Sequence, residues 1–368
     1  MVINFSILGV IMFVSMFWEK GTRKIKASRW STYIMPLLPF LLVFGYITFL
    51  AAMRTNVNDT HAYKQSFENL PGTLENINAI IMSDGKDKGF NILGNLFKMF
   101  ISTDYHMWFA LFAIIESAIF IHILRRETVS LLDTCFYLFS STLYYNYFSM
   151  MRQWFAVSLF FLAFKWMKRR EFIPYLLICL FAAQFHNSAY MCIPIYFLVN
   201  DEPFSKKQMV YILVLCIAVF GLSPILSSLG SSDSTYSYVY TTMTGNSGSS
   251  PVRILIASVP ILISFLYRNK IRALNNQTLN MSLNLSMFNL LLTVLATFTS
   301  GLYIIRFATY FSIFNMILFP FLLEMVLKGE NRKIIKVCFF VFYFIFYIYQ
   351  MNHQGSFGYS SDVIGTYY

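Results

Sequence analysis

Apolar runs of roughly membrane-crossing length recur from one end of the chain to the other, separated by short polar segments. A helix rises about 1.5 Å per residue, so about 20 apolar residues cross a hydrocarbon core of roughly 30 Å. The pattern predicts an all-α polytopic membrane protein that forms one integral-membrane domain over residues 1–368. Spanning helices are predicted at 2–18, 31–53, 105–124, 131–148, 152–167, 208–226, 251–267, 281–298, 307–326 and 337–351.

Two shorter apolar runs, 172–185 and 187–199, flank His186. Each half reaches only about 20 Å, which is less than the hydrocarbon thickness. The pair is therefore either a re-entrant hairpin or two short helices that leave His186 below the outer surface. Counting both halves gives about twelve membrane segments, some of them short or re-entrant, and leaves both termini extracytoplasmic.

Two polar stretches stand out as outer loops. Residues 54–104 form the main extracytoplasmic loop, and within it the apolar run 90–101 is too short to cross, which predicts interfacial helices. Residues 227–250 are rich in Ser, Thr, Tyr and Gly, a composition typical of a flexible loop.

Composition and charge support a membrane protein. Only 12% of the residues are charged, against about 25% in an ordinary soluble domain. The net charge of +11 raises the question of nucleic-acid binding, but the basic residues form short clusters between apolar runs. That is the pattern by which cytoplasmic loops are marked, so we expect a lipid bilayer as partner and no nucleic acid.

The distribution of basic residues also separates one group of arginines from the rest. Most of the 28 Lys and Arg fall in the predicted inner segments, which supports the orientation. Arg54, Arg152, Arg253 and Arg306 instead lie close to the outer ends of four predicted spans. Arginines from four helices can converge on one anionic group, because the planar guanidinium binds phosphate oxygens through paired hydrogen bonds.

A predicted helical hairpin, 144–196, carries the strongest candidates. The basic turn 168–170 lies on the inner side, so Arg152-Gln153 and His186 both fall at the outer side. Charged and titratable groups at membrane depth are costly, which makes them functional candidates. The alternatives are an interfacial anchor for Arg152 and Arg306, and a satisfied polar contact within the bundle for His186.

The start of the main outer loop holds a second polar cluster. Asp59 is either the N-cap of a short helix, a role that Thr60 also fits, or a general base or sugar-hydroxyl ligand, with Tyr63 one helical turn away. Glu116 and Glu324 lie within apolar runs away from the outer face, and we exclude both from the site. No HExxH, DxD or His/Cys cluster occurs in the outer segments, so we predict no metal and no cofactor.

Five features, taken in order, resemble the EpsG family of bacterial exopolysaccharide proteins, which is similar to Wzy-type polymerases. They are the patch Asn58–Phe67, the segment Gly89–Leu93, Met151-Arg152-Gln153 followed by Ala156, Phe185-His186-Asn187-Ser188-Ala189, and Arg306 with Tyr310-Phe311. The chain departs from the pattern before Gly89, where it has Asp87-Lys88 in place of Glu-Pro. We therefore assign no acidic role to that position.

The resemblance implies a GT-C-like helical bundle in the bacterial cytoplasmic membrane. It also implies a metal-independent glycosyltransferase that joins undecaprenyl-diphosphate-linked oligosaccharide units into exopolysaccharide or capsule at the outer face. Arg54, Arg152, Arg253, Arg306, Gln153 and Tyr63 would then bind the diphosphate and substrate, and His186 or Asp59 would activate the hydroxyl. Other polysaccharide-assembly proteins are expected partners.

Two other membrane functions are rivals to the polymerase. A flippase of lipid-linked oligosaccharide is the alternative, but it should carry its charges at mid-membrane depth rather than at one face. A membrane acyltransferase would need a cytoplasmic acyl-donor site, and the inner loops are short and merely basic.

Overall fold

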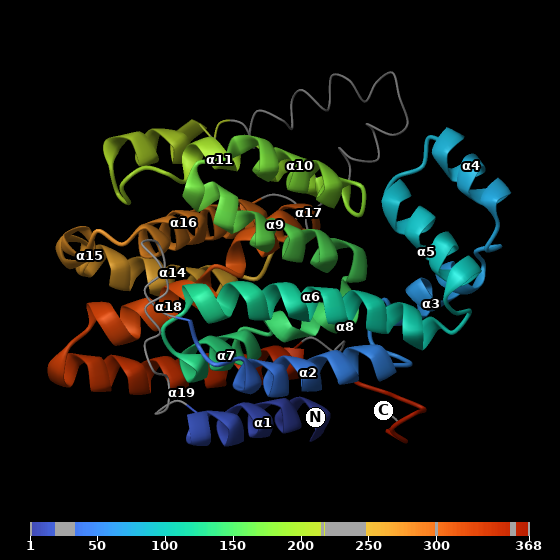
Figure 1. Cartoon of the computed structure of the whole chain (residues 1–368). Helices are drawn as coiled ribbons and strands as arrows, with labels where there is room; N and C mark the ends of the chain where they lie inside the picture. The colour runs from blue at the N-terminus through green and yellow to red at the C-terminus, as the bar shows by residue number, and fades with distance from the viewer. Residues whose placement is uncertain are drawn as a thin grey trace. The chain divides into compact units, whose positions relative to one another are not determined.

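The computed structural model describes residues 2–18, 34–214, 217, 248–298, 301–353 and 358–366 (Figure 1). Within these ranges the regular structure is helical, apart from two isolated β-bridges, Asn56–Ser360 and Ser361–Thr366. Several of the helices are apolar, so the fold is compatible with a polytopic membrane protein. The chain forms two compact units, Met1–Ile193 with Lys333–Tyr368, and Pro194–Arg332. The single domain over 1–368 stays a prediction.

The first unit holds the long helices of the N-terminal half. They are α1 (Val2–Trp18), α2 (Leu37–Met53), α6 (Tyr105–Glu127), α7 (Leu131–Ser140), α9 (Met151–Arg169), α10 (Phe172–Ala183) and most of α19 (Gly329–His353). α2 packs between α1 and α6, α6 packs on α9, and α9 packs on α10. Helices α3 (Thr60–Glu68), α4 (Leu74–Met82) and α5 (Lys88–Phe100), which belong to the predicted outer loop, gather beyond the N-terminal end of α6 (Figure 1).

The predicted hairpin is present in this unit as α9 and α10. Arg170 adopts a left-handed conformation (φ 62°) at the end of α9, where its N–H donates to Met167 O at 3.3 Å. The N–H of Glu171 donates to Trp166 O at 3.0 Å. Two such bonds to the last carbonyls form a Schellman motif, which ends a helix and reverses the chain. The basic turn is thus confirmed as the helix connection.

Local signals explain several helix ends. The Asp104 side chain accepts from the His106 N–H at 2.8 Å and caps α6, and Arg125 and Arg126 in the last turn complement the helix dipole. α1 has the bounds expected from its apolar run. α6 and α9 each extend two or three residues beyond their predicted inner ends, because the flanking basic residues continue the helix.

One predicted span is wrong, because it is not a continuous helix. Residues 131–148 were expected to cross as one helix, but α7 ends at Ser140. Ser141 Oγ donates to Tyr137 O at 2.5 Å, and Thr142 has φ 63°, a left-handed conformation that a β-branched residue rarely adopts. A short 3₁₀ turn (Leu143–Tyr145) and the four-residue α8 (Asn146–Ser149) follow before α9 begins.

The second unit contains α11 (Ile195–Leu198), α14 (Val252–Leu266), α15 (Arg268–Leu274), α16 (Gln277–Phe298), α17 (Gly301–Ser312) and α18 (Asn315–Phe321), with a π-helical turn over Leu322–Val326. α14 packs on α16, and α16 packs on α17. The predicted span 307–326 is bent by 45° at the α17–α18 break, so it is not one straight helix. The predicted flexible loop 227–250 lies outside the described residues up to position 247.

Among the described residues, α6, α16 and α19 are long and apolar enough to cross a membrane singly. Two bent pairs, α14 with α15 and α17 with α18, raise the number to five when each pair is counted as one span. Four shorter apolar helices of 10–17 residues accompany them. The count of about twelve segments stays a prediction.

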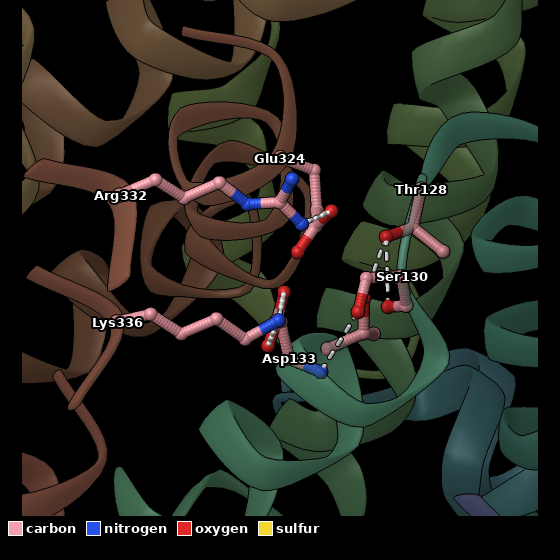
Figure 2. Close-up of polar contacts among 7 residues, drawn as sticks. Thr128, Ser130, Asp133, Glu324, Arg332 and Lys336 are labelled. Atoms are coloured by element: carbon pink, nitrogen blue, oxygen red, sulfur yellow. Dashed lines mark hydrogen bonds and ion pairs between the residues drawn. The ribbon is translucent and has the colours of Figure 1, made fainter. Parts of the chain in front are cut away.

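Ion pairs and backbone contacts mark one end of the first unit. Arg125 Nε donates to Met35 O at 2.8 Å, joining the end of α6 to the start of α2. Lys168 pairs with Glu127 at 2.6 Å across α9 and α6. Lys336 of α19 reaches both oxygens of the buried Asp133 of α7, at 3.0 and 3.1 Å (Figure 2).

Helix capping fixes the position of the buried Asp133 carboxylate. Ser130 Oγ accepts from the Asp133 N–H at 3.2 Å, which caps α7 and fixes the aspartate in its first turn (Figure 2). Figure 2 also shows Arg332 paired with Glu324, a contact within the second unit. Glu324 therefore has an ionic partner, in keeping with its exclusion from the predicted outer site.

The C-terminal tail fastens to the opposite end of α2. The N–H of Thr55 donates to Ser360 O at 2.8 Å, and Tyr359 Oη donates to Leu50 O at 2.8 Å. Ser361 Oγ donates to Met53 O at 2.5 Å. The tail thus lies beside Arg54, at the end of the unit remote from the basic contacts of Arg125.

Candidate active site

Arg152 lies where the sequence places it, as the second residue of α9. Its Nη1 donates to Asp87 Oδ2 at 2.9 Å. The Arg152 side chain keeps 41% of its surface exposed, whereas the Asp87 side chain keeps 11%. The guanidinium is therefore accessible to a ligand, while the carboxylate that holds it is largely covered.

Two aromatic rings border the Arg152 guanidinium. Its carbon lies 5.8 Å from the centroid of Tyr63 on α3 and 5.8 Å from that of Phe90 on α5. The two rings contact each other edge to face at 6.1 Å. Cations are attracted to ring faces at such distances, and aromatic walls reduce the exposure of the charge to water. Tyr63, a predicted site residue, is thus brought to Arg152.

These surroundings shift the pKa of Tyr63. Burial raises the pKa of the Tyr63 phenol, the neighbouring Arg152 guanidinium opposes the shift, and Asp59 adds to it. The phenol therefore stays protonated at neutral pH and can donate a hydrogen bond. Asp59 itself is exposed at the N-cap position of α3, but its side chain makes no capping hydrogen bond.

His186 lies at the turn that follows α10. It is extended (φ −155°, ψ 115°), and its half-buried ring has Nδ1 2.6 Å from Ser188 Oγ. Residues Asn187–Cys192 form a 3₁₀ helix that packs back on α10, where Tyr175 Oη donates to Cys192 O. The chain thus reverses around His186, in agreement with the predicted break between two short halves.

Asp87 joins the His186 turn to Arg152. Its Oδ1 accepts from the backbone N–H of Asn187 at 3.2 Å, while Oδ2 accepts from Arg152. The two sites predicted from the hairpin, Arg152 and the His186 turn, are therefore bridged by one carboxylate from the predicted outer loop. Sequence reasoning missed Asp87. The signal available was that Asp87 stands two residues before Gly89, where the resemblance described above expects Glu.

Arg54 has a different environment although it also lies at a helix end. Its side chain is buried, its Nε donates to Thr60 Oγ1 at 3.2 Å, and Nη1 donates to Ala51 O. The guanidinium stacks 4.1 Å from the centroid of Phe109. Burial lowers the pKa of Arg54 to about 10, with Glu116 as the largest opposing influence. Glu116, assumed to be remote from the outer end, is thus within electrostatic range of it.

The remaining predicted residues are divided between the two units. Gln153 is buried next to Arg152. Arg253 is the second residue of α14, and Arg306 is the sixth of α17, so Arg306 lies more than one turn inside its helix rather than at the edge. Both are half-buried. The Ser249 N–H donates to Ala296 O at 2.9 Å, which places the start of α14 beside the end of α16.

The first-unit cluster combines an accessible guanidinium, a protonated phenol and an imidazole within one outer-loop and helix-turn assembly. Guanidinium and phenol groups bind anions as donors, and imidazole can accept a proton. In the part of the chain that the structure describes, no three His, Cys, Asp or Glu side chains group as metal ligands do. The cluster therefore contains groups that can bind an anion and, in the turn joined to Arg152 through Asp87, a group that can accept a proton.

Comparison with known proteins identifies the family. No curated protein and no solved structure matches the chain. The model of the EpsG family matches residues 37–361, nearly the whole chain. The matched range contains Asp59, Arg152, His186 and Arg306. On this match, in agreement with the all-helical apolar architecture, the chain belongs to the EpsG family.

Proposed function

We propose that this EpsG-family protein is a polymerase of lipid-linked oligosaccharides. It would join undecaprenyl-diphosphate-linked repeat units into exopolysaccharide or capsule at the outer face of a bacterial cytoplasmic membrane. Family membership suggests a Wzy-like polymerase role, and the apolar helices fit a bilayer and a lipid-borne substrate. The observation that carries the proposal is the accessible, aromatic-bordered Arg152 bridged to the His186 turn.

The reaction balances without a cofactor. The bond between the anomeric carbon of the donor glycan and its diphosphate breaks, and the diphosphate leaves with the electron pair. A hydroxyl of the acceptor unit forms the new glycosidic bond to that carbon and loses its proton to a base. The site therefore has to stabilise a departing diphosphate and accept one proton.

Arg152 is suited to the first task. The guanidinium carries five N–H donors, and Asp87 occupies the edge at Nη1, so donors remain for phosphate oxygens. Aromatic neighbours and partial burial strengthen the interaction relative to water. Tyr63, with its phenol protonated, adds a neutral donor beside the same anion.

His186 is the stronger candidate for the base, and Asp59 is the second. The imidazole lies at the apex of the chain reversal, adjacent to the residue whose N–H binds Asp87. Asp59 is exposed and interacts electrostatically with Tyr63. Gln153, Arg253 and Arg306 are proposed to contact the diphosphate or the glycan. The buried contacts of Arg54 favour a supporting role, in which it ties α2 to α3 and α6.

The proposed topology has about twelve membrane segments and extracytoplasmic termini. Within the first unit, Arg54 and the C-terminal tail lie at one end of α2, and Met35 with Arg125 lies at the other. Basic residues at that second end follow the preference of cationic loops for the cytoplasm. This arrangement supports an outer location for Arg54.

The test is polymerisation in vitro with purified protein and synthetic lipid-linked units, with and without a chelator. Ladders of longer glycan that persist in chelator support a metal-independent polymerase. Absence of any lengthening by active preparations would contradict it. In a deletion strain, single lipid-linked units should accumulate outside the cytoplasmic membrane, whereas accumulation inside would indicate the flippase alternative.

A further inference from the structure

Asp87 is the one acidic residue of the described outer loop that forms a salt bridge to a proposed substrate-binding arginine. It immediately precedes α5 and has φ 55°, a left-handed conformation that Asp tolerates better than most side chains. The other ion pair within the described residues of this loop is the local pair Lys64–Glu68. Asp87 thus makes a long-range contact, 65 residues from Arg152 and 100 residues from Asn187.

The docking of α5 on the His186 turn has a second point of contact. The Gly89 N–H donates to Gln184 O at 2.9 Å. A Cβ at Gly89 would lie 2.7 Å from Gln184 Cβ and 2.9 Å from Gln184 O, distances that side chains do not sustain. The glycine is therefore required by close approach of the backbones rather than by an unusual φ.

The two carboxylate oxygens of Asp87 contact both parts of the proposed site. Oδ2 holds the guanidinium of Arg152, and Oδ1 holds the backbone beside His186, so the carboxylate sets the separation of the two. Because Arg152 is 41% exposed, without Asp87 its long side chain would sample other rotamers. Since catalysis depends on the geometry of donors around developing charge, loss of that restraint lowers the rate.

We propose that Asp87 is a positioning residue for glycosyl transfer: through α5 it holds Arg152 and the His186 turn in register. This inference rests on the proposed function. A negative charge beside the anion site also weakens ground-state binding of a diphosphate. Asp87 therefore contributes to the rate and opposes substrate affinity, and these two effects separate it from a residue that only maintains the fold.

The test uses full-length protein carrying Asp87→Asn, with Asp84→Asn as matched control in the same loop. Asp84 is exposed and lies outside the cluster. We expect Asp87→Asn to lower kcat by about 10- to 100-fold while KM for the lipid-linked unit is unchanged or falls. Asp87→Glu, which keeps the charge, should recover part of kcat, and Asp84→Asn should match the wild type.

A second readout does not depend on activity. Hydrogen exchange should show the amides of Gly89 and Asn187 protected in the wild type and exchanging about tenfold faster in Asp87→Asn. Gly89→Ala should produce the same increase at Asn187 through steric displacement of α5. Unchanged exchange in both variants would overturn the docking, whether or not polymerisation is observed.

The two hypotheses fail in different ways. Wild-type protein that does not polymerise would contradict the proposed function, while the exchange experiment would still test the Asp87 contacts. Wild-type protein that polymerises, with Asp87→Asn equal to it in kcat and KM, would overturn the positioning role alone. If Asp87→Asn does not accumulate, Asp87→Glu and Gly89→Ala decide: a rate equal to the wild type in both overturns the inference.

Discussion

Replacement of Arg152 by Lys tests the proposed anion site most directly. Lysine keeps the positive charge but loses the planar fork that binds two phosphate oxygens together. The Arg152–Asp87 pair has a half-exposed cation, and such surface pairs contribute only about 0–1 kcal/mol to the free energy of unfolding. The fold should therefore be almost unaffected.

The effect on the reaction should be much larger. Removing a donor aimed at developing transition-state charge costs about 2.7–4 kcal/mol, which corresponds to a roughly 100- to 1,000-fold lower kcat. The measurement is the initial rate of glycan lengthening by purified protein, with thermal denaturation in detergent recorded on the same samples. Arg126→Lys is the matched control, since Arg126 is an exposed residue in the last turn of α6, at the end remote from the Arg152 cluster.

A rate for Arg152→Lys within about threefold of the wild type would refute the assignment, because that difference is worth less than 1 kcal/mol. A rate loss accompanied by an equal fall in the folded fraction would also refute it, since the loss would then come from folding. An anion-binding role for Arg152 requires that kcat falls with stability preserved and that Arg126→Lys remains active.

Three further predictions follow from the same structure. His186→Gln should lower kcat about 100-fold or more in the lengthening assay, since general bases contribute roughly that factor, and normal turnover would leave Asp59 as the base. Lys336→Ala should lower the free energy of unfolding by about 3 kcal/mol in detergent denaturation, because it removes the cation paired with the buried carboxylate of Asp133; an unchanged melting temperature would show that the pair is not formed. Burial raises the pKa of Tyr359 to about 12, so its contribution to stability is complete below the ordinary value near 10 and is lost as the pH rises toward 12. Tyr359→Phe should remove that part of the alkaline destabilisation, and identical pH profiles for the two proteins would contradict the contact.

The hairpin of α9 and α10 shows what the hydrophobic pattern alone can predict. Apolar length, a basic turn and a break at His186 predict that Arg152 and His186 lie at the same end. The contacts of Asp87 with Arg152 and with the N–H of Asn187, the residue after His186, agree with that prediction. The pattern can predict the positions of the helix ends because a helix has a constant rise, so its length and its connection determine where its ends lie.

Pattern fails where a local hydrogen bond competes with the helix. The run 131–148 is apolar throughout, yet the hydroxyl of Ser141 bonds back to the Tyr137 carbonyl and Thr142 turns the chain. Hydropathy does not distinguish these side chains from others of similar polarity. The helix therefore ends inside a run that satisfies the length criterion for a span.

The amino-acid sequence by itself determined the class of protein, the main helices, the basic clusters between apolar runs and the presence of Arg54, Arg152 and Arg253 at helix ends. Only the tertiary structure decided which of those arginines is available. Arg54 and Arg152 carry the same charge at similar positions, but one is buried against Phe109 and Thr60 while the other is half exposed against Asp87. Burial and partner depend on side chains far away in the sequence, which no local pattern encodes.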